Sequence, residues 1–347
     1  MRAVSYPAYG VLPEVVEVPD PVCPDGGVLV RVAATGVCRS DWHAWTGHDP
    51  VPLPMVPGHE FAGVLAEVGL GVTRWRVGDR VTVPFACGCG DCAVCRAGDT
   101  HVCPNQTQPG FTGWGSFAEL VAIHAADVNV VRLPDEVSFR DGAALGCRFA
   151  TAYRGVATLG QVGPGQWLAV HGCGGVGLSA VLVGVALGAR VVAVDVSEPA
   201  LMLARELGCE ATVLGGDDVV EQVRAVTDGG AHVSVDAVGS AATMQASVAC
   251  LRPRGRHVQL GLLLGADAQA PVPMGAVIAR ELTVLGGHGM PARDYLPMLS
   301  SVAAGQLTPG RLVGRVIELA QAGAALAGLG AEPSGAGITV VEVGRPE

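Results

Sequence analysis

Four cysteines lie close together in the run CGDCAVCRAGDTHVC, at Cys89, Cys92, Cys95 and Cys103. Their spacing is short enough for one loop to bring four thiolates around a single metal ion, and zinc is the ion that a tetrahedral set of thiolates favours. Because four protein ligands leave no open position for a substrate, the spacing predicts a structural zinc site. A chance group of thiols or an iron–sulfur site is the alternative interpretation.

A glycine-rich turn gives a second chemical signal. Gly172, Gly174 and Gly177 form G-x-G-x-x-G between an expected strand, WLAV, and an apolar helix. This pattern allows a tight turn, a close approach of the backbone to a pyrophosphate and close packing of the helix on the strand. Asp195 ends the next expected strand, where a carboxylate accepts hydrogen bonds from ribose hydroxyls and repels a 2′-phosphate. The turn therefore predicts NAD rather than NADP; an ordinary glycine turn with a surface aspartate is the alternative.

The composition narrows the possible classes of protein. The 347 residues suffice for two domains with substantial cores, and 50% hydrophobic residues with 50 glycines suit buried sheets joined by tight turns. The net charge of −10 argues against a nucleic-acid partner, which needs a basic surface. All 22 basic residues are arginine, so a lysine Schiff base, a lysine-containing phosphate loop and pyridoxal chemistry are excluded.

Two segments bear on where the protein resides. The apolar run 172–189 has about the length of a minimal membrane span, but it leads from one expected strand through the glycine turn into the next. We therefore expect no membrane span. The opening MRAVSYPAYGVLPEVVEV lacks the basic flank and apolar core of a signal peptide. We expect a cytoplasmic protein whose 11 cysteines are metal ligands or free thiols.

Three further segments carry single metal-ligand candidates: GVCRSDWHAW around Cys38, PGHEFAG around His59 and LGCRFATAY around Cys147. A lone cysteine is usually a small buried hydrophobic residue. Together with the four-cysteine run, the glycine turn and Asp195, however, these segments follow one another in the order found in one family. On these residues the chain resembles the zinc-dependent medium-chain alcohol dehydrogenases along nearly its whole length.

The resemblance implies an α/β fold with a Rossmann-type doubly wound parallel sheet and a mostly β, GroES-like catalytic domain. Residues 1–145, completed by 286–347, are expected to form the catalytic domain, and residues 146–285 the NAD-binding domain, with the substrate between them. The strands expected in the nucleotide domain, and the strand that returns to the catalytic domain, are residues 167–170, 190–195, 211–214, 232–238, 257–263 and 338–343.

The resemblance also assigns metal ligands. Cys38, His59 and Cys147 are implied to bind a catalytic zinc and to leave its fourth position open for water or substrate. Glu60 corresponds to a carboxylate close to that zinc, and Asp41 to the residue that accepts a hydrogen bond from the zinc-binding imidazole. The chain is therefore expected to bind two Zn²⁺ ions, one catalytic and one structural, together with NAD.

The implied reaction is the reversible transfer of a hydride between an alcohol and NAD, with an aldehyde or ketone as the oxidised partner. Ser40 and His43 are implied to pass the proton of the alcohol to solvent, and His43 suits this role because imidazole titrates near neutral pH. His48 is the competing histidine in the same loop. The resemblance implies that Arg39 pairs with the pyrophosphate of the cofactor and that Thr151 supports the nicotinamide ring. Gly175 and Val176 are implied to contact the cofactor from the glycine turn, and Val238 and Leu262 from positions near the nucleotide and nicotinamide edges.

The chain departs from the family pattern at two cofactor positions. Ala200 stands where many relatives have a lysine, and Ile338 stands where an arginine often contacts the pyrophosphate. Losing two cationic contacts is expected to weaken cofactor binding by about 1–2 kcal/mol each. Arg148, beside Cys147, has two open interpretations: it binds an acidic substrate, or it forms an ion pair within its domain.

The identity of the substrate is less specified than the reaction. Trp45, Phe85 and Trp114 correspond to positions beside the catalytic zinc, which favours apolar or aromatic alcohols; ordinary packing is the alternative. A formaldehyde- or aldehyde-oxidising relative and a non-catalytic NAD(H)-binding redox sensor are the other functional interpretations. A sensor would respond through the cysteines without a ligand role, Cys23, Cys87, Cys173, Cys209 and Cys250. Relatives imply a homodimer or homotetramer.

Overall fold

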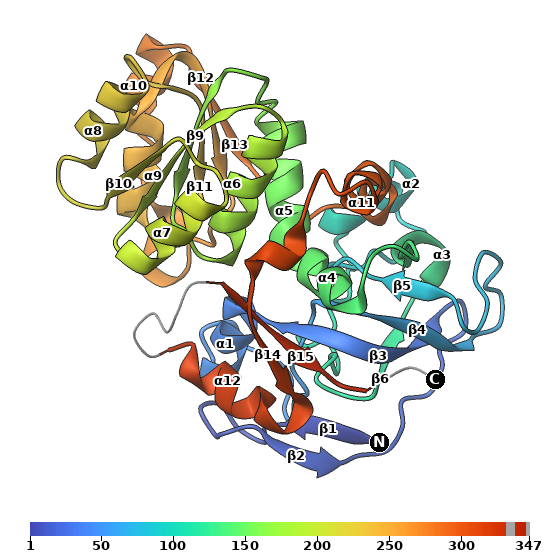
Figure 1. Ribbon diagram of the computed structural model, residues 1–347. Helices are drawn as coiled ribbons and strands as arrows, with labels where there is room; N and C mark the ends of the chain where they lie inside the picture. The colour runs from blue at the N-terminus through green and yellow to red at the C-terminus, as the bar shows by residue number, and fades with distance from the viewer. Residues whose placement is uncertain (331–336, 345–347) are drawn as a thin grey trace.

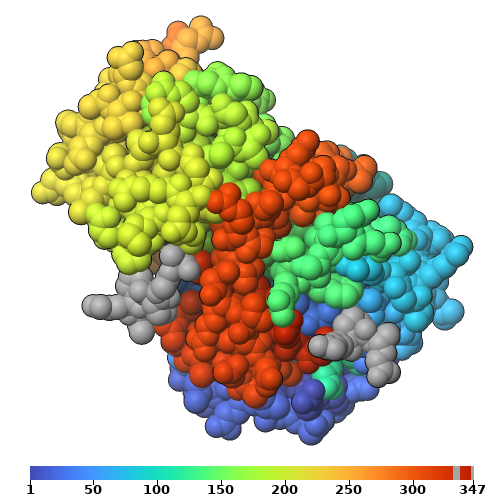
Figure 2. Space-filling view, in the orientation of Figure 1, coloured from blue at the N-terminus to red at the C-terminus, as the bar shows by residue number. Residues whose placement is uncertain are grey.

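Two large sheets organise residues 1–330 and 337–344, the part of the chain that the computed structural model describes. Figure 1 shows each sheet in its own lobe, with the green helical segment after β7 passing from one lobe to the other. In Figure 2 the orange-to-red part of the chain lies along the front of the lower lobe and reaches the upper one. The predicted α/β class is confirmed.

The upper lobe contains a six-stranded parallel sheet in the order β10-β9-β8-β11-β12-β13. In chain order this is 3-2-1-4-5-6, so the direction of winding reverses between β8 and β11, where doubly wound sheets bind ligands at the carboxyl ends of the strands. The strands are β8 Trp167–His171, β9 Arg190–Asp195, β10 Ala211–Leu214, β11 Ala231–Asp236, β12 Leu251–Gln259 and β13 Thr283–Gly286.

Helices follow these strands and bury their apolar faces. Every residue of β8 is buried because helices cover both sides of the sheet, which explains its unbroken apolar sequence. The helices are α6 Gly175–Ala186, α7 Glu198–Glu206, α8 Val219–Val226, α9 Ala241–Ala249 and α10 Met274–Ala279. The side chain of Ser197 accepts a hydrogen bond from the Ala200 backbone and so caps α7, as the sequence suggests.

The lower lobe contains a mostly antiparallel sheet in the order β14-β15-β3-β4-β5-β7, with β6 also paired to β3. The late strand β15 lies between β14 and β3, so the end of the chain completes a sheet that its beginning starts. The strands are β3 Val28–Val37, β4 Phe61–Val68, β5 Arg80–Thr82, β6 Leu120–Ile123, β7 Val131–Arg132, β14 Val313–Glu318 and β15 Ile338–Glu342. A separate two-stranded sheet joins β1 Arg2–Ser5 to β2 Glu14–Glu17.

A helical segment over residues 139–159 connects the two lobes. It begins as α4 Phe139–Ala144, capped by Ser138, and contains α5 Ala150–Tyr153. Two π-helical turns, Leu145–Phe149 and Arg154–Leu159, interrupt the α-helical geometry. Such turns widen the backbone locally and often occur at functional sites. The first of them carries Cys147 and Arg148.

Two sequence predictions for the parallel sheet differ from the structure. The strand predicted over 257–263 begins earlier, at Leu251, and ends at Gln259, so Leu260–Leu263 leave the sheet. Pro253 and the charged residues around it hide the first half of this strand, whose pairing with β11 is irregular there. The edge strand β13 was not among the predicted strands.

None of the helices within residues 1–330 and 337–344 has the length and apolar character that a membrane crossing needs.

Candidate active site

The four-cysteine run folds into a compact sulfur cluster. The Sγ atoms of Cys89, Cys92, Cys95 and Cys103 all lie within 4.8 Å of one another. Three of the Sγ–Sγ distances are 3.5, 3.7 and 3.9 Å. Four sulfurs bound to one zinc at its usual bond length would be about 3.8 Å apart, so the cluster fits that ion. Cys92 accepts a hydrogen bond from the Cys95 backbone, which is the main cause that lowers its pKa to about 7.

Hydrogen bonds attach this cluster to the rest of the molecule. The side-chain amide of Asn129, which is buried, donates to the carbonyl of Gly88 and accepts from its backbone N–H, at 2.8 and 2.9 Å. On the other side, Arg293 donates to the Ala97 carbonyl and pairs with Asp99, at 2.8 and 3.2 Å. The loop is therefore held both to the short helix α3, Ala126–Asn129, and to the later part of the chain.

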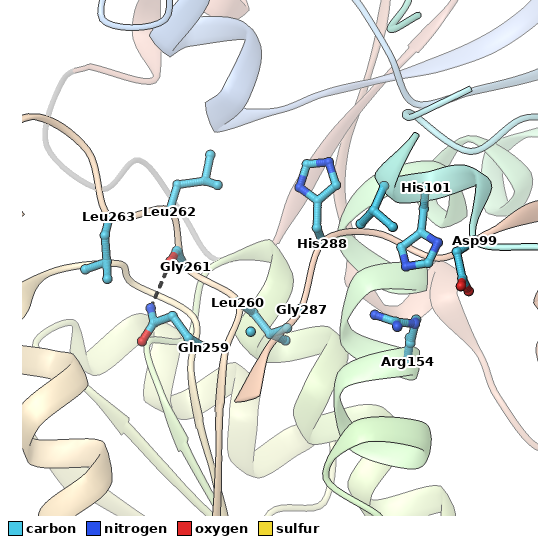
Figure 3. A pocket seen from close by; sticks show the side chains of 12 residues that line it. Asp99, His101, Arg154, Gln259, Leu260, Gly261, Leu262, Leu263, Gly287 and His288 are labelled. Atoms are coloured by element: carbon cyan, nitrogen blue, oxygen red, sulfur yellow. Dashed lines mark hydrogen bonds between the residues drawn. The ribbon is translucent and has the colours of Figure 1, made fainter. Parts of the chain in front are cut away.

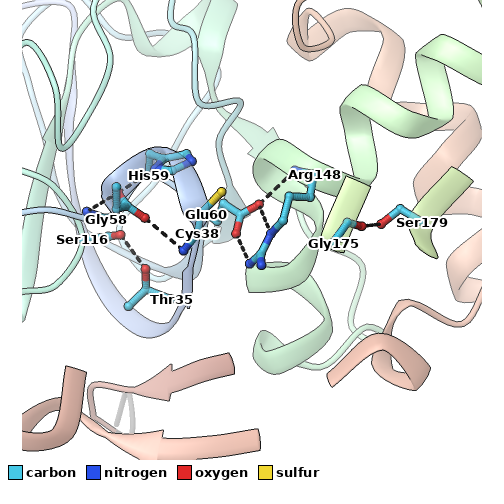
Figure 4. Close-up of polar contacts among 10 residues, drawn as sticks. Thr35, Cys38, Gly58, His59, Glu60, Ser116, Arg148, Gly175 and Ser179 are labelled. Atoms are coloured by element: carbon cyan, nitrogen blue, oxygen red, sulfur yellow. Dashed lines mark hydrogen bonds and ion pairs between the residues drawn. The ribbon is translucent and has the colours of Figure 1, made fainter. Parts of the chain in front are cut away.

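A second cluster brings together residues that are far apart in the sequence. Ligand atoms of Cys38, His59, Glu60 and Cys147 also lie within 4.8 Å of one another. Figure 4 shows Cys38, His59 and Glu60 of this cluster side by side. Cys38 follows β3 and caps helix α1, Arg39–Thr46, while His59 and Glu60 immediately precede β4. Cys147 comes from the first π-helical turn. Two strand ends and a helical turn thus meet at one buried point.

Asp41 determines how the imidazole of His59 is presented. Its carboxylate accepts hydrogen bonds from His59 Nδ1 at 2.8 Å, from the Gly58 backbone at 3.0 Å and from the Cys38 backbone at 3.2 Å. Nδ1 therefore carries the proton, and Nε2 is left buried without a hydrogen-bond partner among the described residues. An imidazole held in this way is oriented for a metal ion, so Asp41 lies where the sequence interpretation requires.

The two thiols of the cluster shift each other's pKa in opposite directions. Cys147 donates a hydrogen bond to Cys38; this contact is the main cause that holds the pKa of Cys38 well below its usual value and that of Cys147 well above it. Burial and the Arg148 guanidinium also act on the pKa of Cys38, in opposite directions. A divalent cation would take the place of the proton, because metals bind the thiolate form.

The predicted proton relay is only partly connected in the structure. Ser40 and His43 both lie on α1, but no hydrogen bond joins them in the described residues. Instead His43 Nδ1 lies 3.4 Å from Nδ1 of His48, whose ring nitrogen is also 3.2 Å from the Thr46 hydroxyl. His48, which the sequence treats as a competitor, is thus a neighbour of His43. Burial, followed by the charges of His48 and Arg39, lowers the pKa of His43 below 6.5.

This pKa shift predicts the pH dependence of the alcohol oxidation that the sequence resemblance implies. Because the pKa of His43 is lowered from 6.5, the imidazole is still mostly neutral at pH 6.5 and can accept a proton there. The acid limb of kcat should therefore have its midpoint below that value, and His43→Gln should remove the limb and lower kcat about 10- to 100-fold near pH 7. His48→Gln is the matched variant: it removes a cause of the shift, so the midpoint should rise. A His43→Gln profile identical to wild type would contradict the relay.

The predicted glycine turn and Asp195 lie at the carboxyl ends of the neighbouring parallel strands β8 and β9. Gly172 has φ +92°, a conformation that favours glycine, and a Cβ on Gly177 would collide with the Gly172 carbonyl. Asp195 accepts hydrogen bonds from the Cys173 and Ser197 backbones, at 2.5 and 2.8 Å.

Two of the other predicted cofactor residues follow neighbouring strands of the parallel sheet, and two lie on helices outside that sheet. Val238 follows β11 and Leu262 follows β12, and both side chains are about half exposed. Thr151 is buried in the connecting helix, whereas Arg39 is exposed and lies 5.3 Å from the ring centre of Trp42.

The structure places both residues that depart from the family pattern, Ala200 and Ile338, and neither offers a charge to the cofactor. Ala200 is in the first turn of α7, where it contributes a backbone N–H to the cap and no charge. Ile338 is 4% exposed and packs in the core between the lobes, so its side chain offers nothing to a phosphate.

The three predicted aromatic residues have different surroundings. Phe85 lies edge-on to His59, with ring centres 6.1 Å apart, and therefore borders the second cluster. Trp45 donates its indole N–H to the Val11 carbonyl, and Trp114 donates to the Pro54 carbonyl. Trp114 also lines a cavity of about 220 Å³ that includes Met1 and the start of β6. Their pocket role stays a prediction.

A larger cavity of about 500 Å³ opens between the two lobes (Figure 3). It is lined by Asp99 and His101 from the four-cysteine loop, by Arg154, and by residues that follow β12 and β13. One of these, His288, stacks edge-on with Phe85 at 5.1 Å, which connects the cavity to the second cluster.

Sequence reasoning missed His101, Arg154, His288 and Phe111, whose ring centre is 5.3 Å from that of His59. No spacing signal marks them, because each is isolated in the sequence and reaches the site only through folding.

Comparison with known proteins agrees with this geometry. Residues 24–135 match the alcohol dehydrogenase GroES-like domain, and residues 175–304 match the zinc-binding dehydrogenase family. An alcohol dehydrogenase of Geobacillus stearothermophilus is 36% identical over 297 residues, which cover 85% of this chain and 86% of the relative.

Solved structures of dehydrogenases also align with nearly the whole chain. The crystal structure of an NAD-dependent alcohol dehydrogenase, 32% identical, aligns with a TM-score of 0.89 over 99% of this chain and 100% of that one. A zinc-binding dehydrogenase from Sinorhizobium meliloti 1021 bound to NADP is 28% identical and aligns with a TM-score of 0.86 over 99% of each chain.

The fold and the paired clusters define a zinc-binding dehydrogenase built on a GroES-like domain and a doubly wound sheet. The chain belongs to the zinc-dependent medium-chain alcohol dehydrogenase family, and it is an oxidoreductase that acts on a small molecule.

Proposed function

We propose that the protein catalyses the reversible oxidation of alcohols with NAD, using a zinc ion held by Cys38, His59 and Cys147. A second zinc ion, held by the four-cysteine cluster, is structural. The observation that carries this proposal is the second cluster: two thiols and a buried imidazole nitrogen without a hydrogen-bond partner converge from three separate segments. Three protein ligands leave a position open for a substrate, as catalytic zinc requires.

The residues of the site have distinct tasks in this reaction. A bound zinc supplies Lewis-acid chemistry that lowers the pKa of an alcohol from about 16 towards about 7. Asp41 keeps the proton on His59 Nδ1, so that Nε2 faces the cluster. Ser40 and His43 take the proton that the alcohol loses, and the buried surroundings of the cluster exclude water that would compete for it. NAD at the glycine turn accepts the hydride.

The test is the initial rate of NADH formation over a panel of primary, secondary, aromatic and polyhydric alcohols and formaldehyde, with NADP run in parallel. We expect turnover with simple alcohols and NAD, and faster turnover with aromatic alcohols because of Phe85. Oxidation of formaldehyde alone would identify the aldehyde-oxidising alternative. Tight NADH binding with no turnover of any alcohol would contradict the proposal and favour a redox sensor.

The preference for NAD is expected to depend on Asp195. The related structures include one that is NAD-dependent and one bound to NADP, so the family alone leaves the choice open. In Asp195→Ala the ratio of kcat/KM for NAD to that for NADP should fall at least about tenfold, because a charged hydrogen bond to the ribose and the repulsion of a 2′-phosphate are both lost. Asp217→Ala, an exposed carboxylate in the same lobe, is the control. An unchanged ratio would show that other groups select the cofactor.

A further inference from the structure

Arg148 lies between the second cluster and the glycine turn, and Figure 4 shows its side chain extending from one towards the other. A Cβ on Gly175 would overlap the Cδ of Arg148 and would lie 3.3 Å from its Nε and Nη1. Gly175 does not have a positive φ, so its backbone does not require glycine. The missing side chain at this position instead makes room for the arginine, which is 8% exposed.

On the side of the cluster, Arg148 holds the carboxylate of Glu60. Its backbone N–H donates to Glu60 Oε1 at 2.9 Å, its Nε donates to the same oxygen at 3.0 Å, and its Nη2 pairs with Oε2. This leaves Nη1, which has no hydrogen-bond partner within residues 1–330 and 337–344. Nε and Nη1 both lie near Gly175, and of the two only Nη1 is left without a partner, so an unpaired donor of a largely buried side chain faces the glycine turn.

The glycine turn offers donors of its own at the same place. Gly174 is the N-cap residue of the 12-residue helix α6, and no side chain caps the helix there. The N–H groups of a first helical turn lack partners within the helix and carry a partial positive charge. An anion seated on this turn would therefore satisfy both the helix terminus and Arg148 Nη1.

Other candidates for a positive charge at this place are missing or turned elsewhere. Ala200 and Ile338 are uncharged, and Ile338 is buried in the core. Arg39 is exposed and lies against Trp42. Arg148 is the arginine that the structure puts in contact with the glycine turn.

We propose that Arg148 binds the pyrophosphate of the dinucleotide through Nη1 while its Nε and Nη2 keep hold of Glu60. One side chain then replaces the cationic contact that is absent at Ile338 and fixes the carboxylate beside the metal ligands at the same time. Arg148 is thus a cofactor-binding residue that also positions Glu60. The proposal rests on the proposed function only in requiring that the glycine turn binds a dinucleotide.

The test is calorimetric binding of ADP-ribose, which contains the pyrophosphate but cannot react. Compared with wild type, Arg148→Gln should raise the Kd for ADP-ribose about 10- to 100-fold, because a charge-assisted contact is lost. Arg148→Lys should recover only part of the affinity, since an ammonium group cannot hold Glu60 and a phosphate in the same fork geometry. The zinc content of each variant is measured in parallel.

A double variant separates phosphate binding from simple neutralisation of Glu60. Arg148→Gln alone leaves a buried carboxylate unpaired and risks misfolding, whereas Glu60→Gln with Arg148→Gln leaves two neutral side chains. We expect the double variant to bind ADP-ribose as weakly as Arg148→Gln, and Glu60→Gln alone to bind it as tightly as wild type.

Recovery of wild-type affinity in the double variant would overturn the proposal, because Arg148 would then only compensate Glu60. Unchanged affinity in Arg148→Gln would overturn it too, while leaving alcohol oxidation with NAD in place. If wild type itself failed to bind ADP-ribose, both this proposal and the proposed function would fail.

Discussion

Replacing Cys38 by serine is expected to lower kcat for alcohol oxidation by at least about a thousandfold. An alcohol must lose its hydroxyl proton as the hydride departs, and zinc chemistry lowers the pKa for that loss by about 9 units, or about 12 kcal/mol. Serine keeps the size of the side chain but is a poor zinc ligand at neutral pH. Even partial loss of the metal therefore removes most of the rate.

The measurement combines kcat with metal analysis. Wild type should contain two zinc ions per chain and Cys38→Ser one, with NADH binding retained because the glycine turn is untouched. Cys87→Ser is the matched control: Cys87 is buried in the same lobe, but it hydrogen-bonds the Pro84 carbonyl and lies outside both clusters. Burial raises the pKa of Cys87 to about 12, so it is a neutral thiol. Retained turnover in Cys38→Ser would contradict the assignment of Cys38 as a ligand of the catalytic zinc.

Replacing Cys103 by serine is expected to lower the stability of the protein, because it removes one ligand of the four-cysteine cluster. Structural zinc in small domains contributes about 10–16 kcal/mol of binding free energy to folding. In a chain of 347 residues, losing even about 5 kcal/mol would lower Tm by about 7 °C. Cys103 accepts hydrogen bonds from the backbones of Cys89 and Asn105, so the loop also loses internal contacts.

Scanning calorimetry with zinc analysis checks this expectation. Cys103→Ser should lose one zinc ion, and the lower-temperature part of its unfolding transition should broaden. Cys23 is a half-buried thiol outside both clusters, so the control variant Cys23→Ser should unfold like wild type. Turnover should fall as well, because Asp99 and His101 in this loop line the large cavity. An unchanged Tm with full zinc content would contradict a structural role for the cluster.

The sequence predicted best what depends on local spacing. The four cysteines lie within one short loop, so their convergence needed no knowledge of the fold. The strands β8 and β9 were predicted closely because buried parallel strands have unbroken apolar sequences. The strand β12 was predicted poorly because its first half contains Pro253 and several arginines.

The second cluster required the resemblance, since nothing local relates Cys38, His59 and Cys147. Contacts formed only by folding were beyond both kinds of reasoning. The ion pair of Arg148 with Glu60 joins residues 88 apart in the chain, and the stacking of Phe85 on His288 joins the two lobes. Nor does the sequence indicate the π-helical turn that brings Cys147 to the cluster. Such contacts depend on tertiary packing, which local patterns do not encode.

The position of β15 has a consequence for the order in which the molecule is made. Thr339 pairs with Val37, so the edge of β3 lacks this neighbour until roughly 300 further residues have been synthesised, which takes about 15–60 s at ordinary rates of translation. The six-stranded sheet, whose last strand ends at Gly286, is complete before then. The nascent chain must therefore carry an unfinished first domain alongside a finished second one. During that interval the exposed strand edge is the part most open to pairing with other chains or with a chaperone.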